Sequence, residues 1–139
     1  MRAPGRLGGM ERGNAAGFTV YLVEDSPAVR ERVRSLLEEI PGVSAAGYAD
    51  TAPDAIRGVV EAQPDVVLLD MQLRQGSGLD VLRALREQAP GVEVYMLTNF
   101  AAEPFRSAAK RLGARDVFDK STEFGQVREL IARRAGIPH

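Results

Sequence analysis

The stretch Pro64–Leu82, PDVVLLDMQLRQGSGLDVL, decides how the rest of the chain is interpreted. Four consecutive branched apolar residues, Val66–Leu69, lie between a proline and a polar loop. Such a short run is typical of a strand buried on both faces in the middle of a parallel sheet. The run ends on the carboxylate of Asp70, and the glycines that follow lead into a helical pattern. The sequence therefore predicts an acid at the carboxyl end of a central strand, where parallel sheets bind ligands.

Strand and helix patterns alternate on both sides of this stretch. The other expected strands are Phe18–Val23, Val43–Tyr48, Val92–Leu97 and Val117–Phe118. The last of these is short and flanked by polar residues, which is typical of an edge strand. Five strands that alternate with five helices predict an α/β fold, a doubly wound five-stranded parallel sheet with helices on both faces.

Capping residues indicate where several of the helices begin. Ser26 before Pro27, and Thr51, are expected to cap the first two helices. Ser121 or Thr122 is expected to cap the last one. The fourth helix is expected to carry its apolar residues inward on one face. They are Phe105, Ala108, Ala109 and Leu112.

The length of the chain allows one domain. Residues 1–17 are rich in Gly with scattered Arg and lack periodicity, so we expect a disordered tail there. About 120 patterned residues remain, enough for one domain with a sizeable core and too few for two. We place this domain at residues 18–136 and expect no effector domain.

Composition excludes several classes of function. The 18 Lys and Arg residues nearly balance the 19 Asp and Glu residues and form no basic run, which argues against nucleic-acid binding. Cysteine is absent, so disulfides and thiolate metal sites are excluded, in agreement with a reducing compartment. No apolar run approaches the roughly 18 residues that a membrane span requires. We expect a soluble, cytoplasmic protein.

Polar side chains follow four of the five expected strands. They are Glu24, Asp25, Asp70, Thr98 and Lys120. Because parallel strands end at the same edge of a sheet, these groups are expected to converge. Three neighbouring carboxylates repel one another unless a cation neutralises them, and oxygen ligands suit Mg²⁺. The hydroxyl and the ammonium can contact a phosphoryl group, so the sequence predicts a magnesium site that handles phosphate.

At these residues the chain resembles the receiver domain of two-component response regulators, from Phe18 to about Arg134. The resemblance rests on an acidic pair, a strand-terminal Asp, a Thr and a Lys, in order and at family-like spacing. It implies the flavodoxin-like strand order 2-1-3-4-5. Each element alone has a plainer interpretation; Glu24 and Asp25, for example, could simply be negative charge near a helix N-terminus.

The resemblance also implies a chemistry. Asp70 would be the phosphoacceptor, attacking the phosphohistidine of a histidine kinase or a histidine phosphotransfer protein. Asp25 and Asp70, with the backbone carbonyl of Gln72 and some help from Glu24, would hold Mg²⁺. Thr98 and Lys120 would contact the transferred phosphoryl oxygens. The protein would then be modified itself and would not act as an enzyme on external substrates.

The chain departs from the family pattern around the last strand and in two loops. The family commonly places Tyr or Phe three residues before the Lys, where this chain has Val117. Phe118 is not a simple substitute, because successive strand residues point to opposite faces. Ser121 replaces the usual proline after Lys120, and Arg74 stands where proline is common. We expect these differences to affect kinetics and output more than phosphorylation itself.

We expect a stand-alone receiver that is a monomer or a weak homodimer. It would signal through phosphorylation-dependent contact with a downstream protein or act as an intermediate in a phosphorelay. The partner surface would be the face of the fourth helix, fifth strand and fifth helix. Its candidate exposed contacts are Arg106, Lys110, Arg111 and Arg128.

Two alternatives to this reading of the chain remain. Haloacid-dehalogenase-like phosphohydrolases also use a strand-terminal Asp with Mg²⁺, but they need a second Asp two residues on, where this chain has Gln72. A pseudo-receiver, which binds partners without being phosphorylated, agrees with the departures at Val117 and Ser121.

Overall fold

The computed structural model describes residues 17–136, so residues 1–16 and 137–139, including all but Gly17 of the expected tail, lie outside the described residues. The strands are β1 (Phe18–Val23), β2 (Val43–Ala49), β3 (Val66–Leu69), β4 (Glu93–Thr98) and β5 (Asp116–Asp119). The helices are α1 (Pro27–Glu38), α2 (Ala52–Ala62), α3 (Gly78–Gln88), α4 (Phe105–Arg111) and α5 (Phe124–Arg134). Within the described range, none of them has the length and apolar character needed to cross a membrane.

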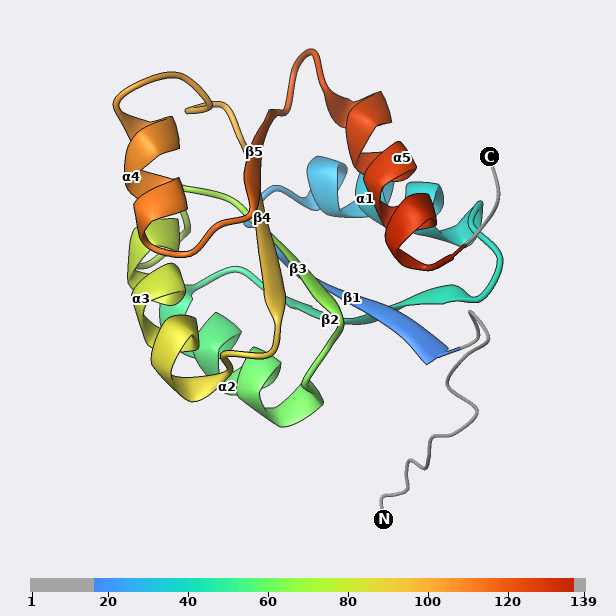
Figure 1. The fold of residues 1–139 in the computed structure, drawn as a ribbon, viewed down its shortest axis with the longest axis horizontal. Coiled ribbons are helices and arrows are strands. Elements are labelled where there is room, and N and C mark those ends of the chain that lie inside the picture. Colours follow the sequence, from blue (N-terminus) through green and yellow to red (C-terminus); the bar gives the residue numbers. More distant parts are fainter. Residues whose placement is uncertain (1–16, 137–139) are drawn as a thin grey trace.

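The strands form one parallel sheet in the order β2-β1-β3-β4-β5 (Figure 1), which confirms the predicted topology. The central strand β3 pairs with β1 on one side and β4 on the other, so Leu68 lies beside Leu22 and Tyr95. All four residues of β3 are fully buried. β5 is an edge strand, as expected from its short, polar-flanked sequence.

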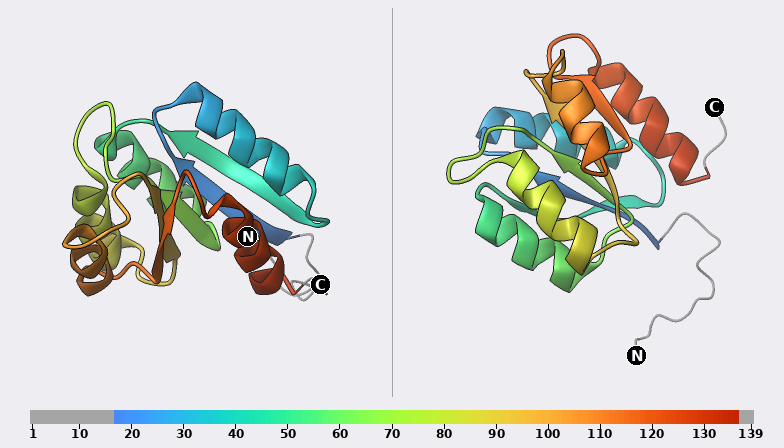
Figure 2. Two further views of the ribbon diagram at one scale, coloured as in Figure 1. Left: turned by 90° about the horizontal axis from the view of Figure 1, so that it is seen from above. Right: turned by 60° about the vertical axis from the view of Figure 1, so that its left-hand side comes forward.

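Helices cover both faces of the sheet, as Figures 1 and 2 show. On one face α2, α3 and α4 pack over Val67 and Leu69, and on the other α1 and α5 pack over Val66 and Leu68. Alternate side chains of β3 therefore lie in the two hydrophobic cores, one on each face of the sheet. Burial of each Val or Leu side chain stabilises the fold by roughly 1.5–3 kcal/mol. The doubly wound α/β class is confirmed.

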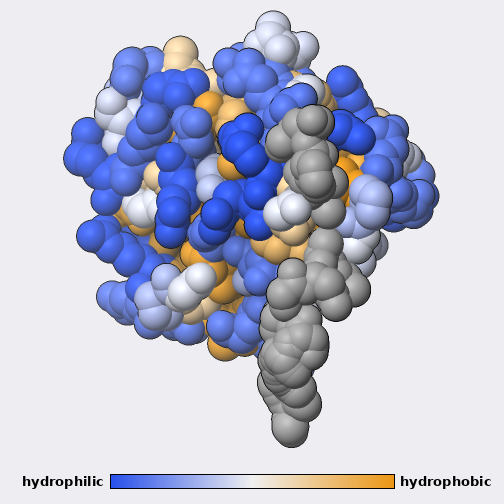
Figure 3. All heavy atoms as spheres, turned by 45° about the vertical axis from the view of Figure 1, so that its right-hand side comes forward, coloured by the Kyte–Doolittle hydropathy of each residue, from blue (hydrophilic) through white to orange (hydrophobic). Residues whose placement is uncertain are grey.

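The outer surface is mostly polar. On the face shown in Figure 3, hydrophobic residues show only in small areas between hydrophilic ones. Among the described residues, the large hydrophobic side chains that are exposed are Tyr48 and Phe105.

The expectation for Phe105 is wrong. It begins α4, but its side chain is 40% exposed and packs edge-to-face on Phe100, with ring centroids 5.6 Å apart. Ala109 is the residue of α4 that is fully buried, and Leu112, just past the helix, packs only partly against the core. A side chain at the first position of a short helix has no preceding turn to lie over, so it packs on the adjacent loop instead.

The expected helix caps are confirmed for α1 and α2, where Ser26 and Thr51 accept hydrogen bonds from backbone N–H groups in the first turn. The expected cap of α5 is wrong. Glu123 occupies the N-cap position and no side chain caps the helix. Carboxylates organise the preceding turn instead. That of Asp119 accepts from the N–H of Ser121 at 2.7 Å, and that of Glu123 accepts from the N–H of Asp119 at 2.8 Å.

The turn from β3 into α3 fixes the backbone around Asp70. Ser77 and Asp80 cap α3 reciprocally, each side chain binding the other residue's N–H. Gly78, the first residue of α3, donates its N–H to the carbonyl of Met71 at 2.7 Å. A Cβ atom on Gly78 would lie 2.2 Å from the carbonyl oxygen of Asp70. Only glycine fits this close approach of helix and strand end.

We therefore expect Gly78→Ala to displace the Asp70 backbone and to lower the free energy of unfolding by about 1–3 kcal/mol, the usual cost of overpacking. Gly125→Ala in α5 is the control, because a Cβ atom there would meet no heavy atom within 4 Å. Alanine in a helix should leave that variant as stable as the wild type or more so. Urea unfolding measures the stability of both variants. Equal stabilities would contradict the close approach of Gly78 to the Asp70 carbonyl.

The start of β4 is tied to the end of α5. Arg134 Nε lies 2.9 Å from Glu93 Oε1, and the Tyr95 hydroxyl donates to the same oxygen at 3.1 Å. Burial by itself raises the pKa of Glu93, but the hydrogen bonds from Arg134 and Tyr95 outweigh burial and lower the pKa below its ordinary value of 4.5. A lowered pKa in the folded state means that the ionised form stabilises the fold.

This contribution is present above the unfolded-state pKa and is lost as the pH falls through the folded-state pKa. Glu93→Gln is thus expected to lower the free energy of unfolding by about 1 kcal/mol at neutral pH. The difference from wild type should shrink as the pH falls from neutrality through the folded-state pKa, which lies below 4.5. Glu87→Gln, at an exposed site on α3, serves as the matched control. Urea unfolding at neutral and at acidic pH measures the free energy of unfolding of both variants and the wild type. A difference between Glu93→Gln and wild type that stays the same at the two pH values would disprove the prediction.

Candidate functional site

Three carboxylates meet at the carboxyl edge of the sheet. Glu24 and Asp25 follow β1, and Asp70 follows β3, the neighbouring strand. One oxygen of each carboxylate lies within 4.8 Å of the others. Glu24 is 1% exposed and Asp70 6%, whereas Asp25 is exposed. The structure thus brings together the three acids that the sequence singled out, with one of them facing solvent.

Lys120, which follows β5, reaches the two buried acids. Its Nζ lies 2.6 Å from Asp70 Oδ2 and 2.8 Å from Glu24 Oε1, and its side chain is only 12% exposed. Buried carboxylates are costly unless they are paired and hydrogen-bonded. The ammonium of Lys120 offsets part of the cost of burying these carboxylates. The cluster still has three acidic side chains and one basic side chain.

Burial and pairing oppose each other in the pKa values of this cluster. Burial raises the pKa of Glu24, and the nearby charge of Asp70 raises it further against the opposing hydrogen bond from Lys120. For Lys120, burial alone would lower the pKa, but hydrogen bonds to Asp70 and Glu24 outweigh it and the pKa is raised. The ammonium therefore stays charged while the crowded acids favour an additional cation.

Each oxygen of Asp70 has a donor. Oδ1 accepts from the N–H of Met71 at 2.7 Å, and Oδ2 accepts from Lys120. The N–H of Asp70 itself donates to the carbonyl of Val23 at 3.0 Å. The carboxylate is thus held in one orientation at the end of the central strand.

Thr98 ends β4 and is fully buried. Its Oγ1 accepts from the N–H of Phe100 at 3.1 Å, within the β4–α4 loop. A hydroxyl group that accepts one bond can still donate its own hydrogen. The carbonyl of Thr98 accepts from the N–H of Lys120 at 3.1 Å, which joins the ends of β4 and β5.

Gln72 lies two residues after Asp70, with an exposed side chain. It forms an isolated backbone bridge with Ser77 across the β3–α3 loop. The bridge closes the β3–α3 loop on itself just after Asp70, and a role for the Gln72 backbone carbonyl in the site stays a prediction.

A pair that the sequence did not reveal holds this loop from the other side. Arg74 donates from Nε and Nη2 to the two carboxylate oxygens of Asp50 at 3.1 and 3.2 Å. The hydrogen bond from Arg74 lowers the pKa of Asp50. Arg74 stands where the resemblance leads one to expect proline. The loop is therefore held by an ion pair with Asp50 and not by the rigid ring of a proline. Asp50 lies 24 residues away in sequence, and no local pattern marks it.

The expected partner surface is partly engaged within the molecule. Arg106 bonds to groups on the β4–α4 loop and β5, and Arg128 pairs with Glu39 at 3.2 Å. Arg106 is thus half-buried, with 32% of its side chain exposed, whereas Arg128 keeps 43% exposed, and partner contact through either residue stays a prediction. Lys110 and Arg111 are exposed, with Lys110 Nζ 3.6 Å from Asp116.

The donor set fits a hard divalent cation. The three acids offer only carboxylate oxygens, and one of them faces solvent, from which water can complete the coordination. Mg²⁺ prefers oxygen ligands and keeps several waters when it is bound by a few carboxylates. The composition of the cluster thus matches the cation that the sequence predicted.

Comparison with known proteins identifies relatives of the whole described domain. The family model described as the response regulator receiver domain matches residues 20–132. The probable transcriptional regulatory protein TcrX of Mycobacterium tuberculosis is 35% identical over 132 residues, which cover 92% of this chain and 55% of that protein. Response regulator GacA of Pseudomonas aeruginosa is 29% identical over 112 residues, or 81% of this chain and 52% of that protein.

A solved structure agrees with these matches. The two-component response regulator of the LuxR family from Aurantimonas sp. SI85-9A1 superimposes with a TM-score of 0.78 at 28% identity, covering 85% of this chain and 84% of that chain. The chain spans about half the length of the two curated relatives, 55% and 52%. Sequence, fold and site agree, and the chain belongs to the family of response regulator receiver domains of two-component systems.

Proposed function

We propose that this chain is a cytoplasmic receiver that takes a phosphoryl group onto Asp70 with the help of Mg²⁺. The observation that carries the proposal is the convergence of Glu24, Asp25 and Asp70 with Lys120 at one edge of the sheet. In a receiver-family chain this arrangement supports phosphoryl transfer better than it supports phosphohydrolase chemistry, which needs a second Asp where this chain has Gln72.

Asp70 is the nucleophile in this mechanism. One of its oxygens attacks phosphorus as the bond from phosphorus to the imidazole nitrogen of the donor's phosphohistidine breaks in line. The donor is a histidine kinase or a histidine phosphotransfer protein. Hydrogen bonds from Met71 N–H and Lys120 hold the carboxylate in place before the transfer.

Asp25 and Asp70, with the backbone carbonyl of Gln72 and with Glu24, would hold Mg²⁺. When bound, the ion neutralises charge on the carboxylates and on the phosphoryl oxygens. Glu24 also accepts from the N–H of Ser26 at 3.0 Å, which orients its carboxylate from the start of α1.

Lys120 and Thr98 act after the transfer. The ammonium of Lys120, which at rest bonds Asp70 and Glu24, pairs with the new phosphoryl oxygens. The hydroxyl of Thr98 keeps its bond from Phe100 and donates its hydrogen to another phosphoryl oxygen. These contacts draw the loops after β4 and β5 toward the site and bias a two-state equilibrium on that face.

The output we propose is contact with a downstream protein and not nucleic-acid binding. Lys and Arg residues are spread over the described surface, and many pair with acids of the same chain. The exposed Lys110 and Arg111 on α4 remain candidates for partner contact. Weak homodimers would form through the same face.

Incubation with acetyl phosphate and Mg²⁺ is expected to add one phosphoryl group, measured by intact mass spectrometry. The adduct should be absent from Asp70→Asn, which lacks the nucleophilic oxygen, and from a metal-free sample. Circular dichroism of the variant checks that it is folded. No adduct on the folded wild type would favour the pseudo-receiver, and turnover of a small phosphomonoester would favour the phosphohydrolase.

Asp25→Asn is expected to raise the Mg²⁺ concentration that gives half-maximal phosphorylation by about tenfold, which corresponds to losing roughly 1.4 kcal/mol of binding. Asp25 is the exposed acid of the cluster, so its neutralisation should leave stability nearly unchanged. The adduct is titrated against Mg²⁺ by mass spectrometry, beside Asp54→Asn at an exposed site on α2. An unchanged midpoint would remove Asp25 from the metal ligands.

A further inference from the structure

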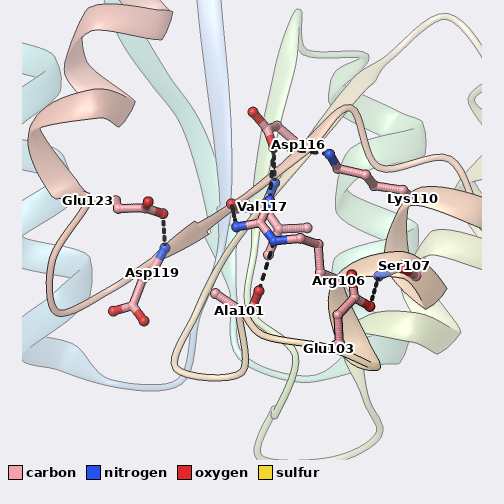
Figure 4. A network of polar contacts seen from close by, with 9 residues as sticks. All are labelled: Ala101, Glu103, Arg106, Ser107, Lys110, Asp116, Val117, Asp119 and Glu123. Carbon is pink, nitrogen blue, oxygen red and sulfur yellow. Dashed lines mark hydrogen bonds and ion pairs between the residues drawn. The ribbon is translucent and has the colours of Figure 1, made fainter.

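Side chains cover the free edge of β5, as Figure 4 shows. The N–H of Val117 donates to Asp116 Oδ1 at 2.8 Å, and the carbonyl of Val117 accepts from Arg106 Nη2 at 3.0 Å. Further along, the N–H of Asp119 donates to Glu123 at 2.8 Å. Backbone groups on the edge of a sheet are otherwise free to pair with another chain. Here the cover includes a residue from α4.

Arg106 makes a second bond that reaches outside β5. Its Nε donates to the carbonyl of Ala101 at 3.0 Å, and its Nη1 lies 3.4 Å from Asp116 Oδ1 (Figure 4). One guanidinium thus joins the β4–α4 loop to the last strand, and only 32% of the side chain is exposed. The planar fork holds its donors in fixed directions. If one acceptor moves and the guanidinium moves with it, its bonds to the other acceptors must change.

The loop that Arg106 holds begins at the candidate site. Thr98 Oγ1 accepts from the N–H of Phe100, and Ala101, the next residue, is buried. If the Thr98 hydroxyl turns to a phosphoryl oxygen on Asp70, its bond to the Phe100 N–H would carry Phe100 with it. The carbonyl of Ala101, which accepts from Arg106 Nε, would then move as well.

We propose that Arg106 is the positioning residue that transmits phosphorylation of Asp70 from the β4–α4 loop to the outer edge of β5. The inference rests on the proposed function. Val117 is a buried aliphatic residue, so its own side chain offers no polar contact with this loop. A guanidinium that binds the Val117 carbonyl supplies the connection from outside the strand.

Neighbouring cations on α4 do not make the same connection. Among the residues that the structure describes, the ammonium of Lys110 pairs only with Asp116, at 3.6 Å. The guanidinium of Arg111 has no hydrogen bond or ion pair with any residue in the range 17–136. Arg111 therefore offers a matched control, with the same helix and the same charge but no link to β5.

The test compares ¹⁵N-labelled protein before and after treatment with acetyl phosphate and Mg²⁺, with the extent of modification measured by intact mass. Nuclear magnetic resonance reports on the Nε–H of Arg106, the amide of Phe100 and the hydrogen exchange of the Val117 amide. In the wild type we expect all three to respond. Exchange at Val117 should change at least about fivefold, the lower end of usual coupling between sites.

Arg106→Met should keep the response at Phe100 and lose the response at Val117, whose own bond to Asp116 is intact. Arg106→Lys keeps the charge but not the fork, so it should give a change at Val117 smaller than that of the wild type. Arg111→Met should behave as the wild type does. If Arg106→Met fails to fold, Arg106→Lys decides the matter alone.

A full response at Val117 in either Arg106 variant would overturn the inference. So would a phosphorylated wild type whose Val117 amide does not respond, because the adduct would then form without coupling. The mass measurement separates these results from failure of the proposed function. In that case no adduct forms on any protein, and the inference falls with the function on which it rests.

Discussion

The ion pairs between Lys120 and the two buried acids are the contacts on which the site depends. Two carboxylates side by side at 1% and 6% exposure would repel each other without a cation between them. Lys120 follows β5, whereas Asp70 follows β3, so β4 lies between their strands in the sheet. The pairing forms only when three strands are in register. The site is therefore a consequence of the whole sheet and not of any local motif.

Backbone fit and inter-loop pairs set the geometry around those acids. Gly78 lets the start of α3 approach the carbonyl of Asp70, and Arg74 ties the same loop to Asp50. On the far side, Arg106 joins the β4–α4 loop to β5. Arg74 is itself a departure from the family pattern, and Arg106 contacts Val117, which is another. In each case an arginine guanidinium joins two segments of the chain, where the family pattern has a proline ring or an aromatic side chain.

Local signals predicted some features well and others poorly. The run Val66–Leu69 has no polar side chain, so only the middle of a covered sheet suits it, whereas the strand order was predicted from the family resemblance. The caps at Ser26 and Thr51 were predictable because their acceptors bind N–H groups three residues on. The cap of α5 was not, because carboxylates at Asp119 and Glu123 compete for the same turn. Phe105 was misjudged because its neighbour Phe100 lies in a loop without periodicity.

The sequence by itself determined the α/β class, the central strand and the list of polar groups at the strand ends, because apolar periodicity and the alternation of elements are local properties of the chain. The tertiary structure alone decided which of these groups touch. Lys120 and Asp70 are 50 residues apart, Arg74 and Asp50 are 24 apart, and Arg106 meets a backbone carbonyl that no side-chain pattern records. Contacts of this kind depend on how the packed layers bring distant segments together, and packing is a property of the folded chain as a whole.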